Sequence, residues 1–426
     1  MLINCLRGMK RKAHGAQKPR HIQKYVEVAS AAQHVGAVRE PPLIPAQAIN
    51  QRFLNDSSDI RSTWVEISLG RLEQNLTAIR QRVGNTKVML VVKANAYGHG
   101  MMEVSGALAD KSDYIGVAVL QEGIMLRNHG IKTPILVMGG VWGDQIRHYL
   151  QNDLTLTASS IERLEQIDAV AGVMKIRAKV HLKIDTGMER IGIHYYNAHK
   201  LQEAALRCGN VETEGIYSHF ADADARDAGN ARVQLERFNE VTRFYERRSL
   251  PMPIRHIANS AAILQMPESY MDMVRPGIMF YGVYPSREVS RTVDIRPALE
   301  WKSRVVYFKV VSPGHPVSYG GKWQPEHETR VVTLPAGYGD GYFRRMSGLA
   351  DVIIRGKKYK QVGTICMDQM MINLEQGSAW NGDEAILLGE SGGERITAED
   401  LAEWAGTIPY EILTNINTRV PRIYTA

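Results

Sequence analysis

Residues 88–100 read VMLVVKANAYGHG, in which an apolar run leads directly into a lysine and then into a turn of small residues. The run predicts a strand buried in a parallel sheet. A lysine at the end of such a strand loses water from its ammonium, which lowers its pKa, so the amine of Lys93 can attack a carbonyl and carry a Schiff base. Gly98 and the Tyr97 hydroxyl would let donors approach a ligand closely. A lone lysine of this kind is more often paired with a carboxylate, and this stretch by itself leaves that alternative open.

The strand-then-helix rhythm of this stretch extends along most of the chain. From Trp64 onward, short β-rich runs alternate with amphipathic stretches, as expected of a parallel sheet or barrel. Candidate strands fall at residues 64–67, 88–92, 115–120, 134–138, 154–157, 180–184, 215–219, 255–258 and 273–275. The apolar face of a helix expected at 231–247 comprises Val233, Phe238, Val241 and Phe244. Nine strands are one too many for a (β/α)8 barrel, so we expect the first to pair outside it.

After about residue 296 the rhythm changes to closely spaced alternating runs, punctuated by glycine and proline. These runs lie at 304–311, 329–334, 352–355, 370–374 and 384–388, and no long helix is expected before 398–404. The change predicts a separate β domain. The expected fold class is therefore α/β, with a (β/α)8 TIM-like barrel over residues 63–295 and a mostly β C-terminal domain over 296–426.

The formal net charge of +7 is concentrated at the start of the chain. Residues 1–62 hold ten Lys or Arg against four acidic residues, which leaves 42 basic and 41 acidic residues for the remainder. The folded body is nearly neutral, so no nucleic-acid partner is expected for it. Residues 1–62 lack sustained periodicity and contain PPLIP at 41–45, which predicts a basic, extended or disordered extension. It could touch RNA, acidic lipid or an import receptor, or be a solvated tail or a misassigned start.

Targeting and redox signals favour a cytoplasmic protein without a membrane partner. No apolar run approaches membrane-spanning length, and the first residues lack the apolar core of a secretory signal. Cys5, Cys208 and Cys366 form no C-x-x-C pair and are odd in number. This pattern argues against a disulfide framework and against a structural zinc site, so we expect a reducing compartment and no metal.

Ionisable side chains recur at the predicted strand ends, where barrels collect their catalytic groups. His181, Lys183 and Asp185 alternate along one strand and so share a face, and Arg190 follows. A structural ion network explains this spacing as well as a binding site does. Tyr217 and His219 likewise share a face at the end of the next strand.

The last two barrel strands are expected to end in donors for an anion. Asn259 and Ser260 end one strand, and Arg275 and Gly277 end the other. Strand ends in these positions often bind phosphate in such barrels. Each residue alone would merely make a turn, so the inference depends on their combination.

Several other features are weak by themselves. Tyr319 stands beside two glycines, which is more typical of a hairpin turn, and Tyr410 reads as a lone structural tyrosine. The segment PAGYGDG at 335–341 lacks the G-x-G-x-x-G spacing of a nucleotide loop. Cys366 has no nearby histidine, so a thiol catalyst is not expected.

Taken together, nine motifs resemble those of the alanine racemase family in the family's order. They are VVKANAYGHG (91–100), HLKIDTGMERIGI (181–193), GIYSHFADAD (215–224), HIANSAA (256–262), MVRPGIMFYG (273–282), VSYGG (317–321), LPAGYGDGY (334–342), VGTICMDQM (362–370) and TIPYEIL (407–413). The resemblance spans residues 64 to about 422 and leaves the extension unmatched. It implies a barrel that binds pyridoxal 5'-phosphate (PLP), a β domain, and a head-to-tail homodimer whose sites are built from both chains.

The resemblance also implies roles for individual residues. Lys93 would hold PLP as an imine and act as one acid/base group, and Tyr319 of the partner chain would be the other. Arg275 would face the pyridine nitrogen, with His219 bridging Arg275 and Tyr319. The cofactor phosphate would be held by Tyr97, Ser260, Tyr410 and the backbone of Gly277 and Ile278.

The substrate side of the site follows from the same resemblance. Arg190 would contact the cofactor's phenolic oxygen and the substrate carboxylate, helped by the backbone of Met367. Lys183 matches a lysine that many family members carry as a carbamate, which would orient Arg190. Tyr338, with Tyr410, would narrow the entrance and favour a small side chain.

The implied activity is interconversion of L- and D-alanine, which in bacteria supplies D-alanine for peptidoglycan. The nearest alternative is a PLP racemase of broader range, which the pair Lys183 and Arg190 disfavours. A PLP-dependent decarboxylase needs no tyrosine at Tyr319, and a non-catalytic PLP carrier resembles the barrel alone. An RNA-associated protein that uses the basic extension is the alternative from another class.

Overall fold

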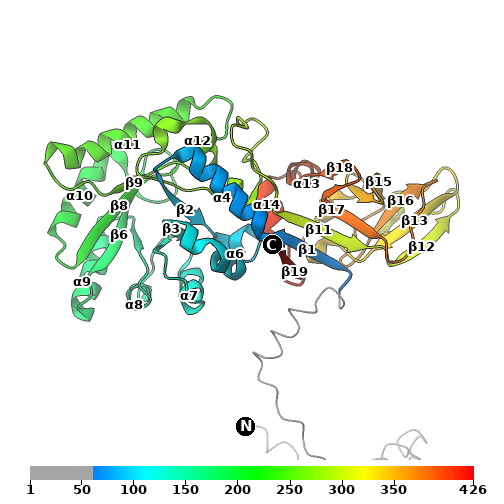
Figure 1. Ribbon diagram of the computed structural model, residues 1–426, viewed down its shortest axis with the longest axis horizontal. Helices are drawn as coiled ribbons and strands as arrows, with labels where there is room; N and C mark the ends of the chain where they lie inside the picture. The colour runs from blue at the N-terminus through cyan, green and yellow to red at the C-terminus, as the bar shows by residue number, and fades with distance from the viewer. Residues whose placement is uncertain (1–60) are drawn as a thin grey trace, which may run out of the picture. The chain divides into compact units, whose positions relative to one another are not determined.

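The computed structural model describes residues 61–426, and in this part of the chain eight parallel strands close into a barrel (Figure 1). In chain order they are β2 (Lys87–Val91), β3 (Tyr114–Val117), β4 (Ile135–Val137), β5 (Leu156–Ala158), β6 (Ala178–Asp185), β8 (Val211–Tyr217), β9 (Ile254–His256) and β10 (Met273–Val274). All are parallel to their neighbours. The (β/α)8 barrel expected from the sequence is thereby confirmed.

Backbone hydrogen bonds close the barrel at the two places where its strands are short. The order β10-β2-β3-β4 forms one sheet and β5-β6-β8-β9 forms another. Between β4 and β5, the Thr155 N–H donates to the Ile135 carbonyl at 2.8 Å. Between β9 and β10, the Arg275 N–H donates to the Ala258 carbonyl at 3.0 Å. The carboxyl ends of all eight strands therefore face one mouth.

Amphipathic helices cover the outside of the barrel (Figure 1). They are α4 (Leu69–Val83), α6 (Met101–Leu108), α7 (Leu120–Asn128), α8 (Gln145–Gln151), α9 (Ile161–Met174), α10 (Ala198–Arg207), α11 (Gly229–Arg247) and α12 (Ser260–Gln265). In α4 the Ser68 hydroxyl accepts from the Arg71 N–H at 3.1 Å and so caps the first turn.

The predicted face of α11 is partly wrong. Phe238 and Val241 are buried as expected, whereas Val233 is 42% exposed. The buried stripe instead runs through Leu235 and Tyr245, because polar Gln234 turns inward to bond the His219 carbonyl. Periodicity of apolar residues alone does not reveal such a buried amide.

The first strand, β1 (Thr63–Ser68), pairs outside the barrel. The sequence predicted this, because it contains one strand more than an eight-stranded barrel can hold. Strand β1 runs antiparallel to β11 (Leu299–Arg304) and parallel to the last strand, β19 (Arg422–Thr425). Figure 1 shows β1, β11 and β19 side by side next to the C-terminal strands. The mostly β C-terminal part of the fold thus takes its first strand from the start of the described chain.

The C-terminal sheet has the strand order β12-β13-β16-β15-β14-β17-β11-β1-β19, with β18 on β17. The remaining strands are β12 (Tyr307–Val311), β13 (Thr329–Leu334), β14 (Asp351–Ile354), β15 (Lys357–Val362), β16 (Met370–Glu375), β17 (Glu384–Ser391) and β18 (Glu394–Ile396). Two helices follow, α13 (Ala398–Ala405) and α14 (Pro409–Thr414). None of the helices in residues 61–426 is long and apolar enough to cross a membrane.

The single strand predicted over 304–311 is two strands that change partners. The Val305 N–H donates to Asp383, and the Val306 N–H donates to Thr333. The chain therefore leaves β17 and joins β13 at this point. Strands β15, β18 and β19 were missed, because β15 carries three lysines and the other two are short.

Replacing Trp301 on β11 tests how far the C-terminal sheet contributes to stability. Trp301 is fully buried and meets Tyr342 edge to face, with ring centroids 5.6 Å apart. We expect Trp301→Ala to lower the free energy of unfolding by about 3–5 kcal/mol, the usual cost of an aromatic cavity. Urea unfolding followed by circular dichroism measures this loss.

The matched control is Trp142→Ala, since Trp142 is 77% exposed. Its effect should stay within about 0.5 kcal/mol. Equal losses for both variants would contradict the assignment of Trp301 to the core.

Candidate active site

A cavity of about 920 Å³ opens at the carboxyl ends of the barrel strands. It is lined by side chains at or after the ends of β2, β6, β8, β9 and β10, and by side chains of α14. The predicted site residues that it brings together are Lys93, Tyr97, Lys183, Arg190, His219, Ser260, Arg275, Gly277, Ile278 and Tyr410. Three predicted residues, Tyr319, Tyr338 and Met367, do not line this cavity within the described chain.

Lys93 enters the cavity from an unusual left-handed turn, α5 (Lys93–Tyr97). Residues 94–97 all have positive φ, between 52° and 55°. Each non-glycine residue in this conformation costs about 1–2 kcal/mol, so the turn needs support from its surroundings. Glu122 supplies it, because its Oε1 accepts from the Ala94 N–H at 2.7 Å and its Oε2 from the Ala118 N–H at 2.8 Å.

Glycine is required where this turn ends. Gly98 has φ +83°, and a Cβ there would lie 2.2 Å from the Leu413 carbonyl oxygen of α14. The turn is thus packed directly against α14, which brings Tyr410 into the same cavity. Burial lowers the pKa of Lys93, and the positive charges of Arg190 and Arg275 lower it further. A lowered pKa is what the sequence predicted for this lysine, and it suits a nucleophilic amine.

The donors expected for a phosphate meet at the ends of β9 and β10. The Gly277 N–H donates to the Ser260 hydroxyl at 2.9 Å. A Cβ on Gly277 would lie 2.6 Å from the Tyr97 hydroxyl, so only glycine leaves this space open. Tyr97 and Tyr410 lie close together, with ring centroids 6.1 Å apart. Hydroxyls and backbone N–H groups thus converge on one small volume.

Arg275 is a buried cation with no carboxylate partner among residues 61–426. Its Nη1 bonds the His256 Nδ1 at 2.9 Å, and its Nη2 donates to His219 Nδ1 at 3.1 Å. Burial lowers the pKa of Arg275 to about 10, so the guanidinium keeps its proton near neutral pH. Burial, followed by the charge of Arg275, also holds the pKa of His219 well below its usual range.

A chain of polar contacts leads from Arg275 through the barrel interior. His256 Nε2 bonds His181 Nδ1 at 2.8 Å, and His181 Nε2 lies 3.4 Å from the Glu214 carboxylate. Burial opposes ionisation of Glu214, but its contacts with His181 and Tyr114 lower its pKa to about 2. The Glu214 carboxylate thus stands next to His181 at the far end of the chain of contacts.

Lys183 and Arg190 share the opposite side of the cavity. The Lys183 Nζ donates to its neighbour's carbonyl, Ile184, at 2.7 Å. Burial, and then the charge of Arg275, lower the pKa of Lys183 to about 7. The Asp185 carboxylate accepts the backbone N–H groups of Gly187, Met188 and Arg190, which fixes the loop that carries Arg190. Of the three alternating residues, Lys183 therefore lines the cavity, while His181 and Asp185 hold neighbouring residues in place.

Tyr319, Tyr338 and Met367 lie together elsewhere, on the C-terminal sheet. Tyr319, in the short helix η6 (Tyr319–Gly321), is 70% exposed, and its carbonyl accepts from the Thr364 hydroxyl at 2.8 Å. The Tyr338 N–H donates to Cys366 at 3.0 Å, and the Gly339 N–H donates to Met367 at 2.8 Å. All three side chains are exposed and lie outside the barrel cavity of their own chain.

Both the barrel and the C-terminal β part of the chain match known protein families. Residues 67–285 match the family model "Alanine racemase, N-terminal domain", and residues 298–424 match "Alanine racemase, C-terminal domain". The chain belongs to the alanine racemase family. The alanine racemase of Carboxydothermus hydrogenoformans is 44% identical over 86% of this chain and 100% of its own length. Alanine racemase 2 of Caldanaerobacter subterraneus subsp. tengcongensis is 41% identical over 86% and 95%.

Solved structures agree with this assignment. The alanine racemase of Streptomyces coelicolor A3(2) superposes with a TM-score of 0.83 at 36% identity, covering 87% of this chain and 100% of that one. The enzyme of Clostridium difficile 630 superposes with a TM-score of 0.80 at 37% identity, covering 85% and 96%. The resemblance seen in the nine motifs is therefore confirmed, as is the fold of the alanine racemase family.

Sequence reasoning missed three residues that support the site. Glu122 holds the left-handed turn, and Glu214 anchors the histidine chain. Tyr281 stacks on Tyr97 at 4.9 Å and donates its hydroxyl to the Val91 carbonyl at 2.9 Å. Only Glu122 carries a signal in the sequence, since it follows a strand and stands where a helix's third residue can bond free N–H groups.

The state of Lys183 can be tested by its dependence on pH. Carbamylation needs the neutral amine, and with a pKa of about 7 the neutral form dominates above that pH and is lost below it. With ¹³C-labelled bicarbonate, we expect a carbamate carbon resonance roughly one unit above pH 7 that fades roughly one unit below it. Lys183→Arg is the control and should show no resonance at either pH. A wild-type signal indistinguishable from that of Lys183→Arg would rule out the carbamate.

Proposed function

We propose that this protein is an alanine racemase that interconverts L- and D-alanine with PLP. One observation supports the proposal most directly. A single cavity contains a lysine with a lowered pKa, hydroxyl and backbone N–H donors that suit an anion, and a buried arginine without a carboxylate partner in the described chain. Membership of the alanine racemase family supports the same reaction. In bacteria the product D-alanine feeds peptidoglycan synthesis.

The residues of the cavity fit PLP. Because Gly277 has no side chain, its backbone lies directly beside the Tyr97 and Ser260 hydroxyls, and this set of donors suits a phosphate. Arg275 is a buried donor that no carboxylate of the described chain neutralises, which suits a ring nitrogen with a free lone pair. Tyr97, Ser260, Tyr410 and the backbone of Gly277 and Ile278 would hold the phosphate, and Lys93 would hold the aldehyde carbon.

When bound, PLP withdraws electrons from the substrate's Cα and makes its hydrogen acidic. Lys93 then acts as an acid/base on one face, because its lowered pKa lets the amine accept a proton and return it. Arg275 keeps its own proton, so it would donate a hydrogen bond to the ring nitrogen without protonating it and would limit the electron withdrawal. This restraint favours return of the proton to Cα over transamination.

Inversion needs a second acid/base group on the opposite face of Cα, and we assign this role to Tyr319 of a partner chain. Tyr319 is exposed on the C-terminal sheet and does not line its own chain's barrel cavity. A head-to-tail homodimer would bring it opposite Lys93, where His219 would link it to Arg275. One base alone would mostly restore the starting enantiomer.

The substrate's carboxylate would be held by Arg190 and the backbone of Met367. Arg190 lines the cavity, and its side chain has no carboxylate partner in the described chain. Tyr338, brought by the partner chain with Met367, would narrow the entrance together with Tyr410 and favour the methyl group of alanine.

The protein is proposed to act in the cytoplasm. Cys208 and Cys366, the two cysteines that the structure describes, are both free thiols. Free thiols suit a reducing compartment. The predicted basic extension over 1–62, and the RNA-binding alternative that depends on it, lie almost wholly outside the described residues.

The reaction is tested by incubating L-alanine with the purified protein and PLP. Circular dichroism of the amino acid should decay to zero while its concentration stays constant. Lys93→Ala should abolish this decay, the visible absorbance of the bound cofactor and its reduction by borohydride, because the variant lacks the amine proposed to form the imine with the cofactor.

Consumption of the alanine would instead indicate a decarboxylase. No change in the signal would indicate a carrier. An unchanged spectrum in Lys93→Ala would overturn the lysine assignment.

The shared site is tested by mixing two inactive variants, Lys93→Ala and Tyr319→Phe. After subunit exchange about half of the dimers are mixed, and each mixed dimer holds one intact site, so about a quarter of the wild-type activity should return. Each variant alone should stay inactive after the same treatment. A mixture that stays inactive although subunits exchange would show that Tyr319 does not act across the interface.

A further inference from the structure

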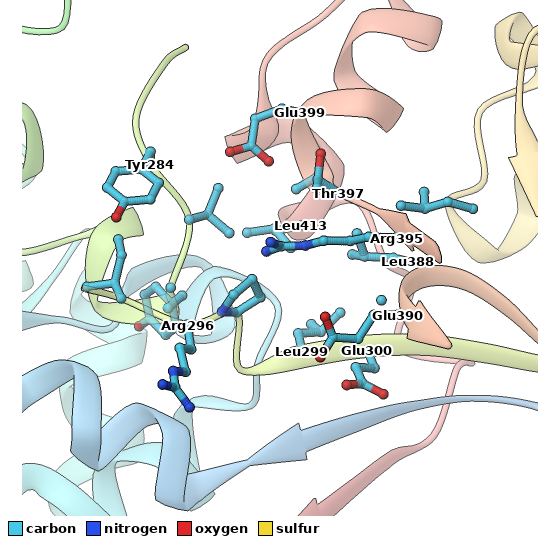
Figure 2. Close-up of a pocket in the computed structure, with 18 of the residues that line it drawn as sticks. Tyr284, Arg296, Leu299, Glu300, Leu388, Glu390, Arg395, Thr397, Glu399 and Leu413 are labelled. Carbon is cyan, nitrogen blue, oxygen red and sulfur yellow. The ribbon is translucent and has the colours of Figure 1, made fainter. Parts of the chain in front are cut away.

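Figure 2 shows a second cavity, of about 850 Å³. It is formed by the segment after η5 (Ile278–Tyr281), by β11, β17 and β18, and by α13. It shares no lining residue with the Lys93 cavity. The wall between the two contains Tyr97 on one side and His99 and Tyr281 on the other, with the rings of Tyr97 and Tyr281 stacked.

His99 lies in the wall of this second cavity and carries a buried acceptor. The side chain is 1% exposed, and its Nδ1 lies 3.0 Å from the Tyr97 carbonyl, so Nδ1 carries the proton and donates. Nε2 is then an acceptor, and it has no hydrogen-bond partner among the described residues. Burial lowers the pKa of His99 to about 4, so the ring is neutral near neutral pH. A donor from a ligand would satisfy Nε2, which otherwise costs folding free energy.

Charged side chains of both signs stand unpaired around the cavity. Arg71 and Arg287 are engaged, by Glu300 and Asp400 respectively. The lining residues that form no ion pair in the described chain are Arg291, Arg395, Glu390 and Glu399. Figure 2 shows Arg395 reaching in from β18 and the Glu399 carboxylate entering from α13.

Part of the lining between these charges is apolar. It is lined by the buried side chains Val283, Ile295, Leu299, Leu388, Ile396 and Leu413. An apolar floor with unpaired charges of opposite sign at its rim matches a small molecule that carries both charges and an apolar body. A purely anionic or cationic ligand would leave one pair of side chains unmatched.

We propose that this cavity binds an α-amino acid with an apolar side chain larger than that of alanine. Its carboxylate matches Arg291 and Arg395, and its ammonium matches the carboxylate of Glu399. The side chain packs on Leu299 and Leu388. This site is separate from the proposed catalytic site, and its test needs no turnover.

L-leucine is the probe, measured by isothermal titration calorimetry on the cofactor-loaded protein. Borohydride treatment beforehand prevents amino acids from exchanging with Lys93. The double variant Arg291→Ala/Arg395→Ala should bind leucine about tenfold more weakly or not at all, because charge-assisted hydrogen bonds are lost. Its matched control is Arg207→Ala/Arg232→Ala, two exposed arginines away from both cavities and free of ion pairs in the described chain, which should bind like wild type.

Further arms distinguish this site from the catalytic cavity. Arg190→Ala should leave leucine binding unchanged, whereas N-acetyl-leucine and leucinamide, which each lack one charge, should bind more weakly. The proposal is overturned if wild type shows no binding, if the two double variants bind alike, or if only Arg190→Ala removes binding. None of these results depends on whether alanine is racemised.

Discussion

The position of Lys93 depends on a strained turn that the rest of the barrel holds in place. Four consecutive residues with positive φ carry the chain away from β2, and no glycine relieves them. Glu122 bonds the first of these residues, and α14 packs against the glycine that ends the turn. The turn sets the directions of both Lys93 and Tyr97, so one constraint positions the nucleophile and the phosphate cradle together.

Electrostatics then give the basic residues of the cavity different protonation behaviour. Burial and positive neighbours lower the pKa of Lys93 and of Lys183, while Arg275 remains protonated. The histidine chain that ends at Glu214 orients Arg275 from inside the barrel. The complementary phenol is carried on another surface, which is why the proposed reaction needs a second copy of the chain.

The sequence predicted the parts of this structure that repeat or that bear recognisable chemistry. The barrel rhythm, the surplus strand β1 and the cavity-lining residues such as Lys93, Arg275 and Ser260 all followed from patterns of neighbouring residues. Glu122 and Glu214 did not, because their roles depend on contacts between distant segments. For the same reason the sequence did not predict that the Gln234 amide lies on the buried face of α11. It also did not predict that the chain changes strand partners at Val305.

The pairing of β1 with β19 has a consequence for biosynthesis. These strands are the first and last of the described chain, and they lie in parallel register from Val65 with Arg422 to Ser68 with Thr425. During translation β1 leaves the ribosome hundreds of residues before β19 exists, so one of its edges stays uncovered until β19 has been made. Loss of residues 422–425 would therefore make β1 the edge strand in place of β19, and a change at one end of the described chain would alter the strand edge that its other end presents.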